Sequence, residues 1–322
     1  MDEHQLRCFL TIAELGSVSR AAAQLNIAQP TLSQLLLRLE DELRIKLFER
    51  TSRGVSPNEA GRIFQEHARN ILNAMQRAKE EVHRHDAVTH GTVAVGLPAS
   101  ISMLLGARLV VAARERLRGI SVRVDEAASG HIREWLELGR IELGVLHHVD
   151  ALRHLSVRRL AVEDLLLVGP PGRFGPPDRH GVAQGEIGLP ATQARPLLLP
   201  SRRNGLRQFV DREALAQGVE LDVEVELDAL VHIKTLVSLG YGYSVLSHSA
   251  VQEDLATGRL SAVRLIRPVL RRTVNLVRNP TRVITHASVR VEDLMVSMLK
   301  GMVADRTWLA EWVGPDLPAI EA

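Results

Sequence analysis

The sequence predicts an α/β fold in which an N-terminal winged helix-turn-helix and one long helix precede a larger C-terminal α/β domain. Three patterns indicate this fold class. Apolar residues near the N-terminus recur at helical spacing in three short runs, and a heptad pattern follows them between residues 64 and 82. From His90 onward, strand-like and helical runs alternate, which is typical of an α/β domain.

The composition agrees with a globular protein and excludes several other classes. The chain of 322 residues is 45% hydrophobic and 24% charged. Its single cysteine, Cys8, excludes an internal disulfide framework and favours a reducing compartment, so we expect a cytoplasmic protein. No run approaches the roughly 18 apolar residues of a membrane span. The net charge is only +2, so nucleic-acid binding has to be argued from how basic residues are arranged.

The first 43 residues predict three helices. Apolar spacing predicts the first over 3–15 and a second, short one over 20–25, capped by Ser17 or Ser19. A tight turn leads to a third helix over 29–43, with a proline in its first turn. Two short helices joined by a turn of about three or four residues form a helix-turn-helix unit.

A wing and a long helix are predicted next. The short basic run 48–55, with a glycine near its tip, predicts a β-hairpin. Ser56, Pro57 and Glu59 predict a capping box that opens the long helix. Within this helix, apolar residues recur at alternating spacings of four and three, which is an a/d seam. We expect the seam to mediate self-association, and packing against the chain's own C-terminal domain is the alternative. The seam consists of Phe64, Ala68, Ile71, Met75, Ala78 and Val82.

The alternation beyond His90 predicts parallel sheets with helices on their faces. The Pro- and Gly-rich segment 170–190 predicts a surface excursion, and we interpret the seven arginines of 263–290 as solvated strand edges. The strand-like runs are 92–96, 121–125, 141–146, 165–169, 197–199, 243–247 and 273–277, and the helical runs are 103–117, 132–138, 207–217 and 231–239.

Short motifs along the whole chain resemble one family. In the N-terminal part they are Gly16-Ser17, Ala21-Ala22, Gln29-Pro30-Thr31-Leu32-Ser33, Leu47-Phe48-Glu49-Arg50-Thr51 and Ala60-Gly61. In the C-terminal part they are 91–96, 138–144 and 236–246. Together they resemble the LysR-type transcriptional regulators. The runs 196–201 and 205–207 look most like the nitrogen-assimilation-control branch of that family.

The resemblance implies a domain organisation. Residues 1–58 would form the DNA-binding domain and 59–88 the linker helix that dimerises the protein. Residues 89–307 would form a two-lobed effector domain that is similar to periplasmic binding proteins, followed by a tail over 308–322. Lobe one would comprise 89–162 and 267–307, and lobe two 163–266. The chain departs from the family at Arg44, where a glycine is usual, and at Leu35 and Leu37, where the recognition helix is usually polar.

By the resemblance, the third helix reads bases in the major groove and the wing contacts the DNA backbone. Gln29 can make a paired contact to adenine, and the hydroxyls of Thr31 and Ser33 can reach bases. Basic residues on the wing suit phosphates or a narrow minor groove. Arg50 could instead pair with Glu40, and any of the polar residues could be plain surface. The predicted DNA-binding residues are Gln29, Pro30, Thr31, Ser33, Gln34, Arg38, Arg50 and Arg53.

The resemblance also implies a cleft for a small molecule between the two lobes, and it indicates which residues line it. A helix N-terminus near Ser100 and hydroxyls from both lobes favour an anion, and arginines of the opposite loop could clamp a carboxylate or sulfonate. The alternatives are helix caps for the serines and surface solvation for the arginines. The predicted effector-binding residues are Ser100, Ile101, Ser102, Ser129, Gly130, Ser201, Arg202, Arg203, Gly205, Leu206 and Arg207.

The predicted function is a sequence-specific DNA-binding transcription regulator controlled by a small organic anion. The alternative is a ligand-independent regulator with a degenerate cleft. The expected partners are promoter DNA, the effector and further copies of the chain in a homodimer or homotetramer, with RNA polymerase as a further candidate and no membrane. We expect no enzyme, cofactor or metal, because the sequence lacks the phosphate-binding, nucleophile and metal-ligand motifs. His147-His148 is interpreted as a surface pair.

Overall fold

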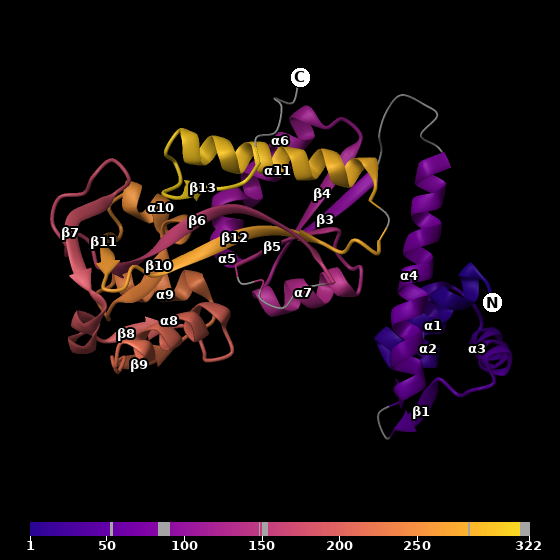
Figure 1. Cartoon of the computed structure of the whole chain (residues 1–322). Coiled ribbons are helices and arrows are strands. Elements are labelled where there is room, and N and C mark those ends of the chain that lie inside the picture. The colour runs from indigo at the N-terminus through magenta and orange to yellow at the C-terminus, as the bar shows by residue number, and fades with distance from the viewer. Residues whose placement is uncertain (52–53, 83–90, 148, 150–153, 283, 316–322) are drawn as a thin grey trace. The chain divides into compact units, whose positions relative to one another are not determined.

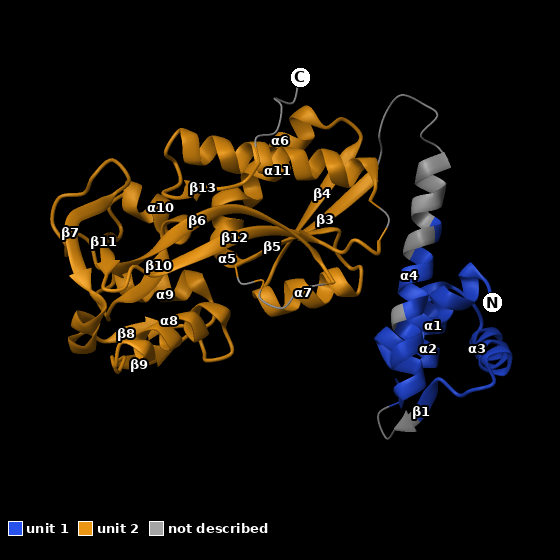
Figure 2. Ribbon diagram, viewed as in Figure 1, with its two compact units in different colours: residues 1–87 blue, residues 88–322 orange. Residues whose placement is uncertain are grey.

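The computed structural model describes residues 1–51, 54–82, 91–147, 149, 154–282 and 284–315. The chain divides into two compact units, residues 1–87 and 88–322 (Figure 2). Among the described residues, no helix combines the length and the apolar character that crossing a membrane requires.

Unit 1 contains the predicted helices and the predicted wing (Figure 1). Ser17 caps the second helix, since its hydroxyl accepts a hydrogen bond from Arg20 N, whereas Ser19 does not serve as this cap. The elements are α1 (Glu3–Leu15), α2 (Val18–Leu25), α3 (Gln29–Leu43), β1 (Phe48–Thr51), β2 (Gly54–Pro57) and α4 (Glu59–Val82).

The long helix α4 begins differently from the prediction. Asn58 is the residue that caps it, because its side-chain oxygen accepts a hydrogen bond from Gly61 N at 2.8 Å. Ser56 and Pro57 belong to strand β2 instead, so the predicted capping box is wrong. The side-chain amide of Asn58 also donates to Lys46 O at 2.8 Å, which holds the start of α4 against the segment before the wing.

Three of the six predicted seam residues belong to the core of unit 1. Ala68 is completely buried beside Phe9, and the ring of Phe64 meets the ring of Phe9 edge-on at 4.9 Å. Ile71 packs against the same cluster. These side chains therefore stabilise the DNA-binding unit itself, through α1. Met75 is half-buried, while the side chains of Ala78 and Val82 lie outside the described residues.

Arg44 ends α3 in the left-handed conformation, with φ of 55°. Its backbone N–H donates to the carbonyls of Glu40 and Asp41, which is the hydrogen bonding of a helix C-cap. Glycine adopts this conformation without a steric cost, whereas an arginine pays for its Cβ. Arg44 can therefore take the place of the usual glycine and keep this conformation, but the replacement costs some stability.

Unit 2 alternates helices and strands as predicted (Figure 1). Up to the second lobe the elements are β3 (Gly91–Leu97), α5 (Ala99–Ile101), η2 (Ser102–Gly106), α6 (Ala107–Arg116), β4 (Ile120–Glu126), α7 (Ser129–Glu137), β5 (Leu143–Leu146) and β6 (Ser156–Gly169). They are followed by β7 (Val182–Gly188), η3 (Leu189–Ala194), β8 (Leu197–Leu199), α8 (Gly205–Ala216), β9 (Val223–Glu226), α9 (Leu230–Ser238), β10 (Ser244–Ser247) and α10 (His248–Ala256). The last are β11 (Ser261–Ile266), β12 (Arg271–Arg278), α11 (His286–Ala304) and β13 (Glu311–Trp312).

Strand β6 connects the two lobes of unit 2. Its first part pairs with β12, and its second part pairs with β10 and β11. All three pairings are antiparallel, because the chain leaves the first lobe along β6 and returns along β11 and β12. Parallel pairs occur between β3 and β4, β3 and β5, β7 and β11, and β8 and β9. The prediction of parallel sheets is therefore right for these pairs and wrong for the strands around β6.

Two segments of unit 2 are more ordered than the sequence indicated. The predicted surface excursion 170–190 contains β7, which pairs with β11 and buries Val182. The predicted tail begins with Trp308, which is 1% exposed, and continues into β13, which pairs with β6. Residues 308–315 are thus part of the folded unit. Residues 316–322 of the predicted tail lie outside the described residues.

Candidate functional site

The N-terminal part of α3 presents polar side chains to solvent. Gln29, Pro30, Thr31, Gln34 and Arg38 are exposed, while Ser33 is half-buried. The buried side chains Ala21, Ala22 and Leu32 pack α2 against α3 and fix the angle at which this surface is held.

Gln29 is positioned by the preceding helix. The hydroxyl of Ser19 donates a hydrogen bond of 3.1 Å to Gln29 Oε1. This contact orients the side-chain amide without using its N–H donors. The amide therefore keeps the donor that a paired contact to adenine requires.

The two unusual leucines of α3 have different environments. Leu35 packs against the core of unit 1, whereas Leu37 is 49% exposed. Leu37 follows Gln34 by three positions, so these two side chains are neighbours on one face of the helix. An apolar side chain on this face can contact a thymine methyl group.

The wing is tied to the end of α1. Val55 N donates to Gly16 O at 3.0 Å, and β1 pairs antiparallel with β2. Gly54 approaches α1 so closely that a Cβ there would lie 2.3 Å from Gly16 O. Arg53 and the side chain of Arg50 lie outside the described residues. Glu40, the alternative partner of Arg50, accepts hydrogen bonds from Lys46 Nζ and Leu47 N.

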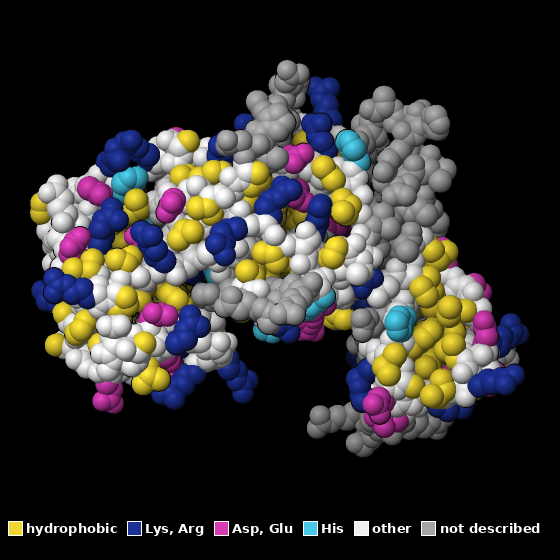
Figure 3. All heavy atoms as spheres, viewed as in Figure 1, with side chains coloured by type: hydrophobic (Ala, Val, Ile, Leu, Met, Phe, Trp, Pro, Cys, Tyr) yellow, Lys and Arg dark blue, Asp and Glu magenta, His cyan; other side chains and the backbone are white. Residues whose placement is uncertain are grey.

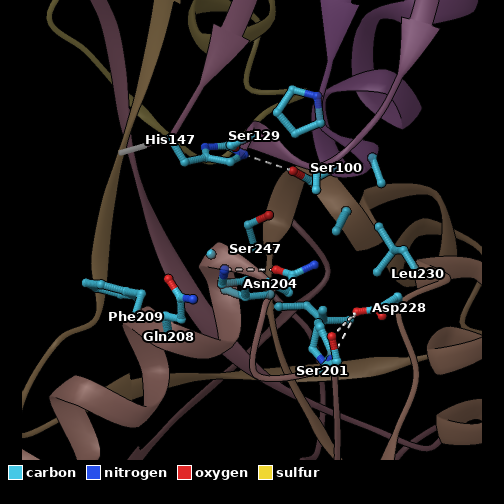
Figure 4. Close-up of a pocket in the computed structure, with 18 of the residues that line it drawn as sticks. Ser100, Ser129, His147, Ser201, Asn204, Gln208, Phe209, Asp228, Leu230 and Ser247 are labelled. Atoms are coloured by element: carbon cyan, nitrogen blue, oxygen red, sulfur yellow. Dashed lines mark hydrogen bonds between the residues drawn. The ribbon is translucent and has the colours of Figure 1, made fainter. Parts of the chain in front are cut away.

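A cavity of about 650 Å³ lies between the lobes of unit 2. Figure 4 shows Ser100, Ser129 and His147 on one side of it and Ser201, Asn204 and Asp228 on the opposite side. The charged side chains of its wall are Glu126, Arg203, Arg212, Asp228 and Arg272. On the visible outer face of unit 2, by contrast, Lys and Arg side chains are spread among acidic and hydrophobic ones (Figure 3).

Six of the predicted effector-binding residues line this cavity, namely Ser100, Ser129, Ser201, Arg203, Gly205 and Leu206. Ile101 instead lies in the core of the first lobe, and Ser102, Gly130 and Arg202 are not part of the wall. Arg207 does not line it either. Its guanidinium is buried and donates to Asp211, Glu226 and Pro200 O, so it fastens α8 to its surroundings.

Ser100 lies at the centre of a hydrogen-bond network. Its Oγ accepts from Arg272 Nη2 at 2.9 Å and lies 3.3 Å from His147 Nε2. His147 Nδ1 lies 3.4 Å from Thr273 O, which can only accept a hydrogen bond. The proton of a neutral His147 ring is therefore on Nδ1, and Nε2 accepts from the Ser100 hydroxyl.

The sequence reasoning missed His147 and Arg272. His147 is 6% exposed and faces the cavity, so its interpretation as part of a surface pair is wrong. It directly follows β5, and the carboxyl end of a strand in an α/β sheet is a common ligand position that could have identified it. Arg272 is 5% exposed and is not a solvated strand edge. Strand alternation could have separated it from the exposed Arg271, because Arg272 is in phase with the apolar Val274 and Leu276.

A winged helix-turn-helix joined to a two-lobed domain with a cavity between the lobes is the architecture of a class of DNA-binding proteins. Family comparison gives the particular family. Residues 4–62 match the bacterial regulatory helix-turn-helix protein, lysR family, and residues 86–299 match the LysR substrate binding domain. The chain therefore belongs to the LysR family. It is a DNA-binding transcription regulator and not an enzyme, which confirms the predicted fold class and the prediction of a DNA-binding regulator.

Relatives of similar length support this assignment. The nitrogen assimilation regulatory protein nac of Escherichia coli (strain K12) is 29% identical over 316 residues, which cover 96% of this chain and 99% of the relative. The nac protein of Klebsiella aerogenes is 26% identical over 303 residues, covering 93% and 95%. These similarities agree with the predicted resemblance to the nitrogen-assimilation-control branch.

Solved structures show the same fold. A cysteine-to-aspartate variant of full-length OxyR from Pseudomonas aeruginosa matches with a TM-score of 0.69 at 22% identity, covering 93% of this chain and 95% of that one. Full-length CbnR complexed with its target DNA matches with a TM-score of 0.66 at 20% identity, covering 91% and 98%.

Proposed function

We propose that this regulator recognises particular promoter sequences with α3 and the wing, and that a small organic anion in the interlobe cavity modulates its promoter binding or DNA bending. The observation that carries the proposal is the cavity itself. Its wall combines hydroxyls of both lobes with arginines, and its volume of about 650 Å³ suits a small molecule. A ligand that contacts both lobes can favour one arrangement of them over another.

The chemistry of the cavity wall favours an anion. Ser129 is the first residue of α7, and N–H groups in the first turn of a helix lack helical acceptors and carry partial positive charge. Ser100 and Ser201 add hydroxyl groups. The wall carries three arginines and two acids, Glu126 and Asp228, and Glu163 pairs with one of these arginines, Arg272, so the hydrogen-bond donors rather than the net charge favour an anion. A carboxylate or sulfonate is therefore a better match than a cation or a sugar.

The exposed part of α3 supports base recognition. Gln29, Thr31 and Ser33 lie in its first turns, which is the part of a recognition helix that reaches base edges. Pro30, Gln34 and Arg38 extend the same surface, and Arg50 and Arg53 of the wing supply charge for the DNA backbone. The structures of CbnR and of a second protein, Vibrio fischeri DarR, have been solved in complex with DNA, which agrees with this use of the shared fold.

We expect self-association to use the part of α4 that does not pack in the core of unit 1. Phe64, Ala68 and Ile71 pack within unit 1, so the dimer contact would rest on Met75 and on the later seam positions Ala78 and Val82. Such a dimer would present two recognition helices to one promoter, and pairs of dimers would form the homotetramer. We expect this assembly to act in the cytoplasm and to contact RNA polymerase at the promoter.

One observation favours the alternative, a regulator with a degenerate cleft. The polar groups at the centre of the cavity already satisfy one another, since Ser100 bonds to His147 and Arg272. A ligand that binds there must therefore replace existing hydrogen bonds, so binding gains only the difference in free energy between the new bonds and the old ones. A change of DNA footprint on adding ligand would exclude the ligand-independent alternative.

Calorimetry of the full-length protein tests the effector assignment. Acetate and benzoate would be titrated beside acetamide and benzamide into the wild type and Ser100→Ala. We expect the acids to bind more tightly than their amides, and Ser100→Ala to weaken acid binding by about 1.5–3 kcal/mol, as expected for a hydrogen bond to a charged group. Tight binding of the amides alone, or indifference to Ser100→Ala, would discard the anion assignment.

A further inference from the structure

The guanidinium of Arg272 links both lobes at the wall of the cavity. Its Nη2 donates to Ser100 Oγ of the first lobe at 2.9 Å and to Ser247 Oγ of the second lobe at 2.6 Å. Arg272 lies at the start of β12, where the chain has just returned from the second lobe to the first. One NH₂ group thus holds a hydroxyl of each lobe beside the space that a ligand would fill.

Glu163 is the counter-ion of Arg272 and has partners of its own. Its Oε1 lies 2.7 Å from Arg272 Nη2, and the carboxylate is completely buried. Ser249 Oγ donates to Oε1 at 3.2 Å, and Trp308 Nε1 donates to Oε2 at 2.8 Å. Glu163 would therefore remain hydrogen-bonded if Arg272 shared its charge with another acid. A buried carboxylate without such donors could not release its cation.

We propose that Arg272 is the cation that recognises the acidic group of the effector, and that Glu163 is its intramolecular counter-ion; this inference rests on the proposed function. The effector acid binds Nη2 where Ser100 and Ser247 now accept, it accepts a hydrogen bond from the Ser100 hydroxyl, and it shares Arg272 with Glu163. An amide of the same shape carries no charge to offer Arg272, so it cannot compete with Glu163. Because Nη2 holds the lobes together through the two serines, binding there also changes how the lobes are joined.

The other arginines of the cavity are poorer charge sensors. Arg203 and Arg212 are exposed, and the guanidinium of Arg212 lies 5.4 Å from the centre of the Phe209 ring. Water and salt screen exposed charges, whereas a buried cation interacts strongly with any anion that reaches it. Discrimination between an acid and its amide should therefore depend on Arg272 rather than on Arg203 or Arg212.

The test compares acid with amide in full-length variants. Calorimetry with acetate, acetamide, benzoate and benzamide gives the ratio of the amide Kd to the acid Kd for each protein. Glu163→Gln removes the competitor and should raise this ratio about tenfold, the effect of one charge-assisted hydrogen bond. The double variant Arg272→Gln/Glu163→Gln leaves no unpaired buried charge and should lower the ratio to about one. Arg271→Gln, the matched control at the exposed neighbouring arginine that is not part of the cavity wall, should change it by less than about twofold.

The outcomes separate this inference from the proposed function. Ser100→Ala can weaken acid binding while the ratio stays the same in the Arg272 and Glu163 variants. That result would overturn the inference about Arg272 but not the proposed function. The same holds if the variants bind acid and amide equally weakly, which would indicate a purely structural role, or if Arg271→Gln abolishes the discrimination. If acids bind none of these proteins, both the inference and the anion effector are discarded. Should the double variant fail to fold by circular dichroism, an unchanged ratio in Glu163→Gln still refutes the proposal.

Discussion

The indole N–H of Trp308 donates a hydrogen bond of 2.8 Å to the carboxylate of Glu163, which precedes it by 145 positions. Both side chains are buried. Glu163 lies in β6, the strand that runs through both lobes, so the contact fastens the C-terminal segment to the connection between them. Leu309 N adds a second link by donating to His248 Nδ1. The end of the chain thus contributes to the lobe connection.

Trp308→Phe should destabilise the protein by about 1.5–3 kcal/mol, because it removes a hydrogen bond to a buried carboxylate. Urea unfolding measures this change. Trp312→Phe is the matched control, since the buried Nε1 of Trp312 has no hydrogen-bond partner among the described residues. We expect this second variant to lose much less stability. Equal losses would mean that the bond to Glu163 contributes nothing beyond packing.

His248 should make stability depend on pH. Burial lowers the pKa of this histidine, whose Nδ1 accepts from Leu309 N and whose Nε2 donates to His180 O. The unfolded chain therefore binds a proton at a higher pH than the folded protein does. Stability is fully present above the usual histidine pKa of about 6.5 and falls as the pH drops from there toward the lowered pKa.

His248→Asn should flatten this acid slope, because asparagine can accept from Leu309 N but does not titrate. Denaturant unfolding at a series of pH values between neutral and mildly acidic measures the slope. The exposed His131 gives the control, and His131→Asn should leave the slope unchanged. If His248→Asn kept the wild-type slope, another group would be responsible for it.

Met75→Glu should weaken self-association without unfolding unit 1. A charge at a dimer seam opposes its own copy on the partner, and Met75 lies beyond the residues that pack in the unit 1 core. Sedimentation should show smaller species than in the wild type. Ile63→Glu, which changes an exposed residue of the same helix outside the seam, should leave the assembly intact. If Ile63→Glu gave smaller species and Met75→Glu did not, the predicted seam would not be the dimer contact.

Gln29→Ala should reduce base discrimination by about 1–3 kcal/mol while the fold stays intact. Arg53→Ala should weaken binding to specific and to scrambled DNA alike, and it should lower the salt dependence of binding by about one ion per bound protomer. Binding assays on a duplex selected from random sequence, beside its scrambled version, measure both effects. Full preference for the selected duplex in Gln29→Ala would show that the proposed register of α3 on DNA is wrong.

The local order of the fold was largely predictable from sequence, because short-range patterns determine it. Periodicity and the proline of its first turn located α3, and alternation located β3, β4 and β5. The sequence predicts Ser56 instead of Asn58 as the cap of α4, because two polar residues so close together give the same local capping signal. The antiparallel course of β12 along β6 depends on how the chain returns between lobes, which no local pattern encodes.

The cavity was predictable only in part. Ser100 and Ser129 follow from the resemblance to the LysR-type regulators, and both line the cavity. The arginines could not be sorted in this way. Arg207 and Arg272 are both buried, but Arg207 pairs with Asp211 and Glu226 away from the cavity, whereas Arg272 faces it. Asp211 lies only four positions after Arg207 in the same helix and is a local signal for its structural role, whereas the partner of Arg272, Glu163, lies 109 positions before it.

We propose that the interlobe cavity controls how the protein binds its DNA. A footprint on a duplex selected from random sequence by the wild type, taken with and without an acid that calorimetry has shown to bind, tests this control. We expect the acid to change the length or the bend of the wild-type footprint and to leave that of Ser100→Ala unchanged at the same concentration. Identical wild-type footprints with and without bound acid would contradict it and indicate a ligand-independent regulator.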